Sequence, residues 1–146
     1  MGPSSSKNKT LLIVSGGIEA ADAAKRAKEM GLYVVVSDRD PYAPGFEYAD
    51  SCIIADVYAP EETAAAAERY ARKLRKIDGV ICVAADAPMT VAAVNKRLGL
   101  KGISEESARL ACDKLAMKER FLAAGVPIPW FSAVSTPQML QRKIGR

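Results

Sequence analysis

Two glycines and a carboxylate follow the first apolar run of the chain. Residues 15–19 read SGGIE and come directly after the run TLLIV. Paired glycines allow a tight turn, and backbone amides at the start of a helix favour anions. A dinucleotide-binding turn would read GxGxxG, whereas this one reads GGIEAA, and Glu19 would repel a phosphate there. The stretch is either a tight turn without a ligand or part of a binding site.

Acidic residues follow two further apolar runs. Asp38 comes about twenty residues after the glycines, where a dinucleotide fold places the carboxylate that binds ribose. Asp86 follows the run VICVAA and precedes Pro88. Asp38 is alternatively a solvated turn residue or a helix cap. Asp86 is alternatively the N-cap of the next helix, or it contacts an amine or hydroxyl group of a substrate.

A lysine at a helix start is the last candidate. Asp113 is expected to cap the helix that begins at Lys114, and the ammonium group of Lys114 is either an ordinary surface charge or a partner for phosphate. The sequence contains no histidine, and its three cysteines form no CxxC pair. We therefore predict no catalytic nucleophile–base pair and no metal ligands in these residues.

The elements that must position these residues alternate between strand and helix. Apolar runs of strand length are separated by Ala-rich, charged segments with proline at the start or glycine at the end. Crossovers of this length predict an α/β fold, a three-layer Rossmann-like parallel sheet with helices on both faces. We expect strands at 10–15, 32–37, 51–55 and 80–85. We expect helices at 18–30, 60–77, 88–98, from Ser104 on, at 114–124 and at 137–145. Residues 38–50 should form a turn-rich loop without a regular element, and residues 126–134 should be extended.

Composition excludes several classes of protein. The net charge is only +4 over 146 residues, and positive and negative side chains mix within the helical segments, so we expect no nucleic-acid partner. No apolar run approaches the roughly 20 residues of a membrane helix, so we expect no membrane partner. An odd number of cysteines without a secretory signal suggests a cytoplasmic protein. Residues 1–9 read as a disordered tail.

At this point the chain resembles a known family. The segments LLIVSGG, MGLYVVVSDRDPYAPGFEYAD, GVICVAAD and LGLKGISEESARLACDKLAMKERFLAAGVPIPWF are similar to the N-terminal, pre-ATP-grasp domain of ATP-grasp ligases, such as carbamoyl-phosphate synthase large subunits and carboxylate–amine ligases. The resemblance implies a Rossmann-like domain at 10–112. It also implies a connecting helix and the start of a truncated ATP-grasp domain at 113–146, a short linker into a missing domain.

The resemblance also implies roles for individual residues. Lys114 matches the basic residue of a "DK" motif that contacts ATP phosphate. Gly17, Ile18 and Glu19 match a turn that helps to hold the substrate, and Asp86 stands where one branch has a glutamate for the same purpose. The implied cofactors are ATP and Mg²⁺, with the Mg²⁺ ligands outside this chain. The implied substrates are a small-molecule carboxylate, which becomes an acyl phosphate, and an amine-type nucleophile.

Three further expectations follow. Alone, the fragment is expected to be inactive, to bind ATP weakly and to form a homo-oligomer through apolar residues of 126–146 such as Trp130. One alternative is a non-catalytic Rossmann-like module that binds NAD(P) or another nucleotide, with Asp38 on the ribose and Gly16 and Gly17 on the pyrophosphate. The other is a subunit that assembles with a separate ATP-grasp chain.

Overall fold

The computed structural model describes residues 9–83 and 85–144, which form two compact units. The first unit ends at Cys112 and the second begins at Asp113. The tail expected at 1–9 lies outside the described residues except for Lys9. Each unit is described by itself below.

Four parallel strands form the centre of the first unit. They are β1 (Thr10–Val14), β2 (Tyr33–Asp38), β3 (Ser51–Ile54) and β4 (Gly79–Ile81), in the order β3-β2-β1-β4. Ile13 of β1 pairs with Val36 of β2 on one side and with Ile81 of β4 on the other. The predicted α/β class with a parallel sheet is confirmed.

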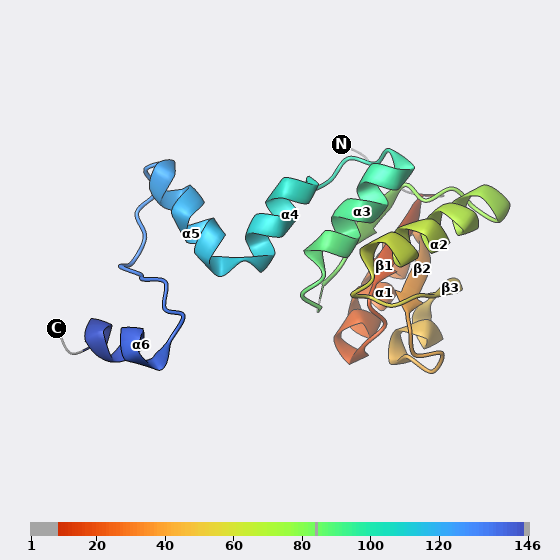
Figure 1. The fold of residues 1–146 in the computed structure, drawn as a ribbon. Helices are drawn as coiled ribbons and strands as arrows, with labels where there is room; N and C mark the ends of the chain where they lie inside the picture. Colours follow the sequence, from red (N-terminus) through yellow and green to blue (C-terminus); the bar gives the residue numbers. More distant parts are fainter. Residues whose placement is uncertain (1–8, 84, 145–146) are drawn as a thin grey trace. The chain divides into compact units, whose positions relative to one another are not determined.

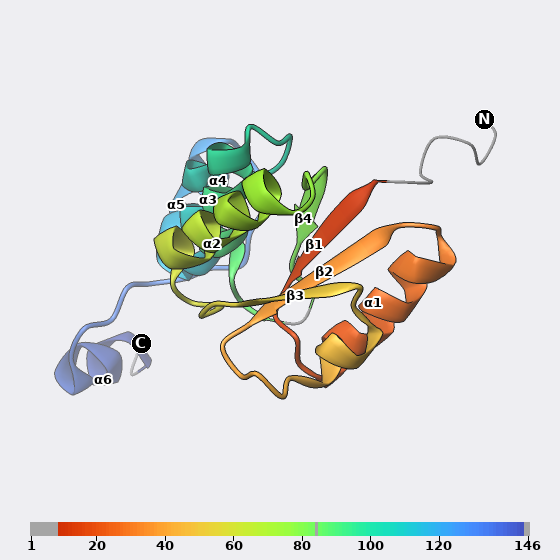
Figure 2. The same ribbon diagram turned by 90° about the vertical axis from the view of Figure 1, so that its right-hand side faces the viewer.

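Helices cover both faces of this sheet. Helix α1 (Ile18–Glu29) lies on one face, and α2 (Pro60–Lys73) and α3 (Pro88–Leu98) lie side by side on the other (Figures 1 and 2). Helix α4 (Glu105–Cys112) packs against α3, and a short 3-10 helix, η1 (Pro44–Tyr48), packs against α1. The arrangement is the predicted three-layer sandwich.

Alternating side chains of β1 and β2 fill two separate cores. Ile13, Val34 and Val36 are fully buried against the alanine face of α1. Leu12, Val14 and Val35 are fully buried on the opposite face, with residues of α2 and α3. Successive strand residues point to opposite faces, so strands covered on both sides are apolar at most positions, and Thr10 and Ser37 are buried polar exceptions. Small alanines on the helices allow close approach to the sheet.

Some elements differ from the prediction. Strand β4 ends at Ile81, the last residue that pairs with β1, although the apolar run continues to residue 85. Helix α2 ends at Lys73, not at 77, since the chain turns there toward β4. The loop expected to lack a regular element contains η1, because Pro44 fixes a backbone angle that suits a first helical position.

The second unit consists of α5 (Lys114–Ala123), an irregular segment and α6 (Pro137–Ile144). Asp113 caps α5 as predicted, since its Oδ1 accepts hydrogen bonds from the amides of Leu115 and Ala116, both at 3.0 Å. No residue of either helix is buried among those that the structure describes.

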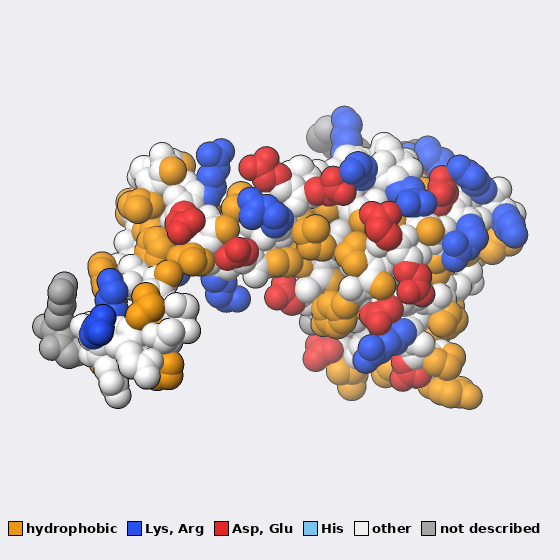
Figure 3. Space-filling view, viewed as in Figure 1, with side chains coloured by type: hydrophobic (Ala, Val, Ile, Leu, Met, Phe, Trp, Pro, Cys, Tyr) orange, Lys and Arg blue, Asp and Glu red, His pale blue; other side chains and the backbone are white. Residues whose placement is uncertain are grey.

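Acidic and basic side chains are interspersed on the face that Figure 3 shows. Within 9–83 and 85–144, no helix is long and apolar enough to cross a membrane.

Two carboxylates hold the amino ends of the central strands. Asp78 Oδ2 accepts from the amide of Thr10 at 3.0 Å, and Asp50 Oδ2 accepts from the amide of Val34 at 2.8 Å. The Thr10 amide, together with Lys76 and Lys9, lowers the pKa of Asp78. Burial opposes ionisation of Asp50, but hydrogen bonds from Lys28 and Val34 outweigh it and lower its pKa. Both groups therefore stabilise the fold in their charged form.

Replacing Asp78 should destabilise the sheet. The variant Asp78→Ala leaves the Thr10 amide without its charged partner, and we expect it to lose about 1.5–3 kcal/mol of unfolding free energy at pH 7 in urea denaturation. Because the folded pKa lies below the unfolded one, this contribution is present above about pH 4 and is lost as the pH falls through the folded value.

The difference between Asp78→Ala and the unmodified chain should therefore shrink in acid. Asp22→Ala is the control, since Asp22 lies on the exposed side of α1, with its side chain 85% exposed. An equal loss of unfolding free energy in both variants, or a loss in Asp78→Ala that does not depend on pH, would contradict this role for Asp78.

Candidate functional site

The carboxyl ends of the parallel strands meet at one edge of the sheet. A cavity of about 200 Å³ at this edge takes residues from the segments that follow all four strands. In open parallel sheets this edge is where ligands bind, at the point where the strand order reverses. The lining residues are Ser15 after β1, Asp38 and Arg39 at the end of β2, Asp56, Val57 and Tyr58 after β3, and Ala85 after β4.

Sequence reasoning missed the contribution of β3 to this cavity. Asp56 comes just after β3, as Asp86 comes after β4, yet only Asp38 and Asp86 were predicted as candidate residues. Asp56 Oδ1 accepts from the amide of Tyr58 at 2.8 Å, and Oδ2 lies 3.5 Å from Arg39. The signal in the sequence that could have identified Asp56 is an acidic residue directly after a strand.

The carboxylate of Asp38 binds the glycine turn of its own chain. Its Oδ2 accepts from the amide of Gly16 at 2.7 Å, and its Oδ1 accepts from the amide of Asp40 at 3.0 Å. In a dinucleotide site the amide of Gly16 would face pyrophosphate and Asp38 would face ribose. Here the amide of Gly16 donates to Asp38 and not to a ligand, which disfavours the pyrophosphate contact of the NAD(P)-binding alternative.

The turn at Gly16 is also closed by the backbone of η1. The carbonyl of Gly16 accepts from the amide of Gly45 at 2.7 Å. A Cβ atom at Gly16 would lie 2.9 Å from the Cβ of Ala43 and 3.2 Å from a methyl of Val36. Only a residue without a side chain fits at this crossing of three segments.

Adding a methyl group at this crossing should disrupt it. We expect Gly16→Ala to lower the unfolding free energy by about 1–3 kcal/mol, because its neighbours belong to a packed core. Gly17→Ala is the matched control: Gly17 has φ −59°, and its nearest contact to an added Cβ is a flexible carboxylate oxygen of Glu19 at 3.5 Å. Thermal unfolding of both variants tests this. Equal shifts in Tm would show that the close packing around Gly16 is not what requires glycine.

The other residues predicted to bind substrate lie at the same edge. Gly17 is the N-cap of α1, Ile18 is 72% exposed in its first turn, and Glu19 is exposed beside it. Asp86 follows β4, which is the neighbour of β1 in the sheet. The expected alternative of Asp86 as an N-cap is wrong, because Ala87 holds that position without a side-chain hydrogen bond. Asp86 lines a second cavity, of about 450 Å³, beside β4.

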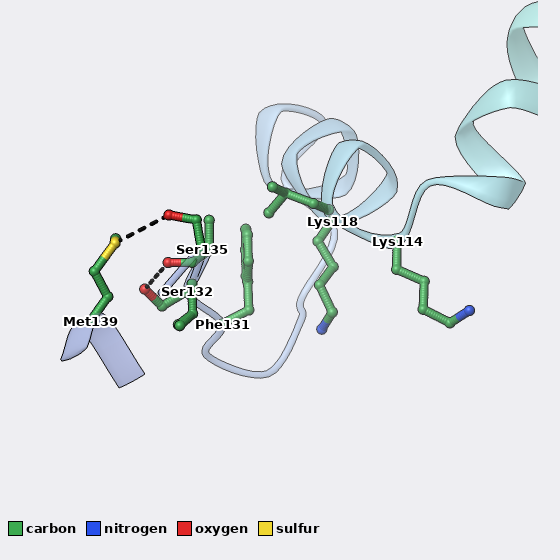
Figure 4. A pocket seen from close by; sticks show the side chains of 9 residues that line it. Lys114, Lys118, Phe131, Ser132, Ser135 and Met139 are labelled. Carbon is green, nitrogen blue, oxygen red and sulfur yellow. Dashed lines mark hydrogen bonds between the residues drawn. The ribbon is translucent and has the colours of Figure 1, made fainter. Parts of the chain in front are cut away.

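Lys114 lies at the rim of a cavity within the second unit. This cavity, of about 490 Å³, is formed by the start of α5, the segment 131–135 and Met139 of α6. Figure 4 shows the Lys114 side chain pointing away from Phe131, whereas the Nζ of Lys118 lies 5.4 Å from the centre of the Phe131 ring. Asp113 already accepts from the amides of Leu115 and Ala116 at the start of α5, so Lys114 offers an anion its ammonium charge and not the helix amides. Sequence reasoning did not single out Lys118, and it named Phe131 only as an apolar residue of the segment 126–146.

Metal binding finds no support in the described residues. Across 9–83 and 85–144, no group of three or more acidic, cysteine or histidine residues is placed to hold a metal ion. No chemical step is therefore assigned to a metal here.

Comparison with known proteins supports the resemblance. No protein-family model matches the chain. It is 27% identical over 123 residues to a 3-methyl-D-ornithine–L-lysine ligase of Methanosarcina barkeri, a match that covers 83% of this chain and 32% of the relative. The chain thus spans about a third of the length of that curated relative.

Two solved structures have a similar fold. The phosphoribosylglycinamide synthetase of Anaerococcus prevotii matches with a TM-score of 0.72 and 26% identity, over 94% of this chain and 34% of that one. The N5-carboxyaminoimidazole synthetase of Staphylococcus aureus, in complex with ADP, matches with a TM-score of 0.71 and 21% identity, over 94% of this chain and 36% of that one. In fold and in sequence, this chain resembles the N-terminal part of ATP-grasp ligases, as predicted.

Proposed function

We propose that this chain is the N-terminal domain of an ATP-grasp ligase that joins a carboxylate to an amine-type nucleophile. The observation that carries the proposal is the match to a phosphoribosylglycinamide synthetase over 94% of the chain. The match is supported both by structure, with a TM-score of 0.72, and by sequence, with 26% identity. The ligase that matches by sequence supports the same class of reaction. The remainder of the ligase is the proposed partner, in the same polypeptide or as a separate subunit.

The proposed reaction has two steps. The substrate carboxylate takes the γ-phosphoryl group of ATP, which gives an acyl phosphate and ADP. The amine nitrogen then attacks the acyl carbon and displaces phosphate, and the nitrogen loses a proton. A carbamoyl-phosphate-synthase-like reaction is one form of this chemistry. Positioning and charge neutralisation supply most of the catalysis in phosphoryl transfer.

We assign two tasks to this chain and no covalent step. Lys114, at the start of α5, is proposed to pair its ammonium group with a phosphate of ATP. Gly17, Ile18, Glu19 and Asp86 are proposed to contact the substrate at the carboxyl edge of the sheet. Mg²⁺ is proposed to be held by residues outside this chain. The three cysteines are free thiols, which fits a cytoplasmic setting.

Removing the charge of Lys114 should weaken ATP use. In the complete ligase that contains this domain, we expect Lys114→Ala to raise KM for ATP by about tenfold or more, since a charge-assisted hydrogen bond contributes about 1.5–3 kcal/mol. ATP-dependent phosphate release with a panel of carboxylates and amines measures this. Lys101→Ala is the control, because Lys101 is exposed in the segment between α3 and α4. An unchanged KM would remove Lys114 from the ATP site, and a protein that releases no phosphate with any substrate pair would refute the ligase itself.

We also propose that the 146-residue chain self-associates through its second unit. Trp130 is 79% exposed there, and Leu122 and Ile144 are exposed as well. Exposed apolar surface of this kind favours association. Size-exclusion chromatography with light scattering should give a mass above that of a monomer, and Trp130→Ser should lower it. Tyr42→Ser, at an aromatic residue of the first unit that is 89% exposed, should not lower it. A monomer for the unmodified chain would contradict the proposal.

A further inference from the structure

A basic patch lies where α2 ends, at the amino ends of the strands and opposite to the candidate site (Figure 1). Lys9 and Lys76 place their Nζ atoms 3.6 and 3.4 Å from Asp78 Oδ1, and Arg75 Nε donates to Thr10 Oγ1 at 2.8 Å. The turn after α2 is thereby bound to the start of β1, and both segments contribute to one surface. The basic residues of the patch are Lys9, Arg69, Arg72, Lys73, Arg75 and Lys76.

This patch carries the whole charge excess of the chain. The sequence has 21 basic and 17 acidic residues. Six of the basic residues lie in the patch, together with two acidic residues that pair with them, Glu68 and Asp78. The remainder of the chain therefore has as many positive as negative side chains. A solvated surface of mixed charge does not concentrate the excess in this way, whereas a binding surface for an acidic partner does.

The helix dipole accounts for only part of this charge. Arg72 and Lys73 lie in the last turn of α2, where positive charge offsets the dipole. Arg69 lies one turn earlier on the same face as Lys73, and three other basic residues of the patch lie outside the helix. Arg72 pairs with Glu68 at 2.7 Å, but neither Arg69 nor Lys73 forms an ion pair with any residue that the structure describes. These two exposed charges, one helical turn apart, are open to a partner.

The other side chains of this surface favour a protein partner over a nucleic acid. Leu74 is 73% exposed between the charges and offers an apolar contact. Sites for single strands stack bases on aromatic rings, but Tyr70 is buried here and the guanidinium of Arg75 covers the ring of Tyr33 at 4.3 Å. The two carboxylates of the patch would also repel a continuous phosphate backbone. The surface fits separate carboxylates beside an apolar side chain.

We infer that this patch binds an acidic segment of a partner protein. Carboxylates of that segment pair with Arg69 and Lys73, and an apolar side chain beside them rests on Leu74. Because the patch lies at the amino ends of the strands, such a partner leaves the candidate site at their carboxyl ends open. The inference does not depend on the ligase reaction, since binding is measured with this chain alone.

Three matched probes test the chemistry of the partner. A fluorescein-labelled twelve-residue peptide that repeats Glu-Glu-Leu is titrated with the 146-residue chain and followed by fluorescence anisotropy. We expect saturable binding that weakens about fivefold or more between about 0.02 and 0.2 M NaCl, because salt screens exposed charges. The same peptide with Gln in place of Glu should bind about tenfold more weakly. A twelve-base-pair DNA duplex should bind more weakly than the acidic peptide. A duplex that binds as tightly, or an acidic peptide that does not bind saturably, would overturn the inference.

Variants locate the binding on the surface. Arg69→Glu combined with Lys73→Glu should weaken binding of the acidic peptide about tenfold or more. Lys101→Glu combined with Arg109→Glu is the matched control, because it changes the net charge equally at exposed residues in and before α4 and should have about a twofold effect at most. Leu74→Ser should weaken binding about threefold through the lost apolar contact.

Equal losses in the two charge-reversed pairs would overturn the inference, since they would show attraction to net charge and not to this patch. Arg69→Gln combined with Lys73→Gln removes the same charges without adding repulsion, and it replaces the reversed pair if that pair unfolds. Unchanged affinity in this neutral pair would likewise overturn the inference.

Discussion

Burial of β1 and β2 on both faces is the constraint on which the rest of this structure depends. Leu12 and Val35 face one layer of helices, while Ile13, Val34 and Val36 face the other. Strands of this kind are stable only between two helical layers, and parallel neighbours require long crossovers. The crossovers return the chain to the same end of the sheet each time. Four strand ends therefore meet at one edge, and the candidate site is a consequence of that geometry.

Whether the glycine turn at this edge can bind pyrophosphate depends on a single carboxylate. Asp38 accepts from the amides of Gly16 and Asp40, so the glycine turn is tied to the end of β2. A turn that binds pyrophosphate needs such amides free to donate to the ligand. In this chain the sheet keeps the Rossmann-like arrangement of strands, while the contact that defines dinucleotide binding is replaced by an internal one.

Local signals predicted most of the helices and strands and the cap at Asp113, although they missed η1 and the ends of α2 and β4. Pro88 and Gly99 bound α3 at the residues expected, and Asp113 caps α5. The features that could not be predicted depend on contacts between distant segments. The bond between Gly16 and Asp38, the packing of Gly45 on Gly16 and the burial of Asn95 against Gly102 arise only after the layers pack. The end of β4 depends on where its pairing with β1 stops, and neither this nor the strand order can be read from an apolar run.

The most direct test of this account is a nucleotide titration of the 146-residue chain, followed by NMR at the amides of Gly16 and Asp40. The account predicts that NAD⁺ and NADP⁺ cause no saturable shift at either amide up to millimolar concentration, because the carboxylate of Asp38 already occupies both. Saturable binding of either dinucleotide in the micromolar range, with shifts at Gly16 and Asp40, would contradict it. The chain would then be a dinucleotide-binding module.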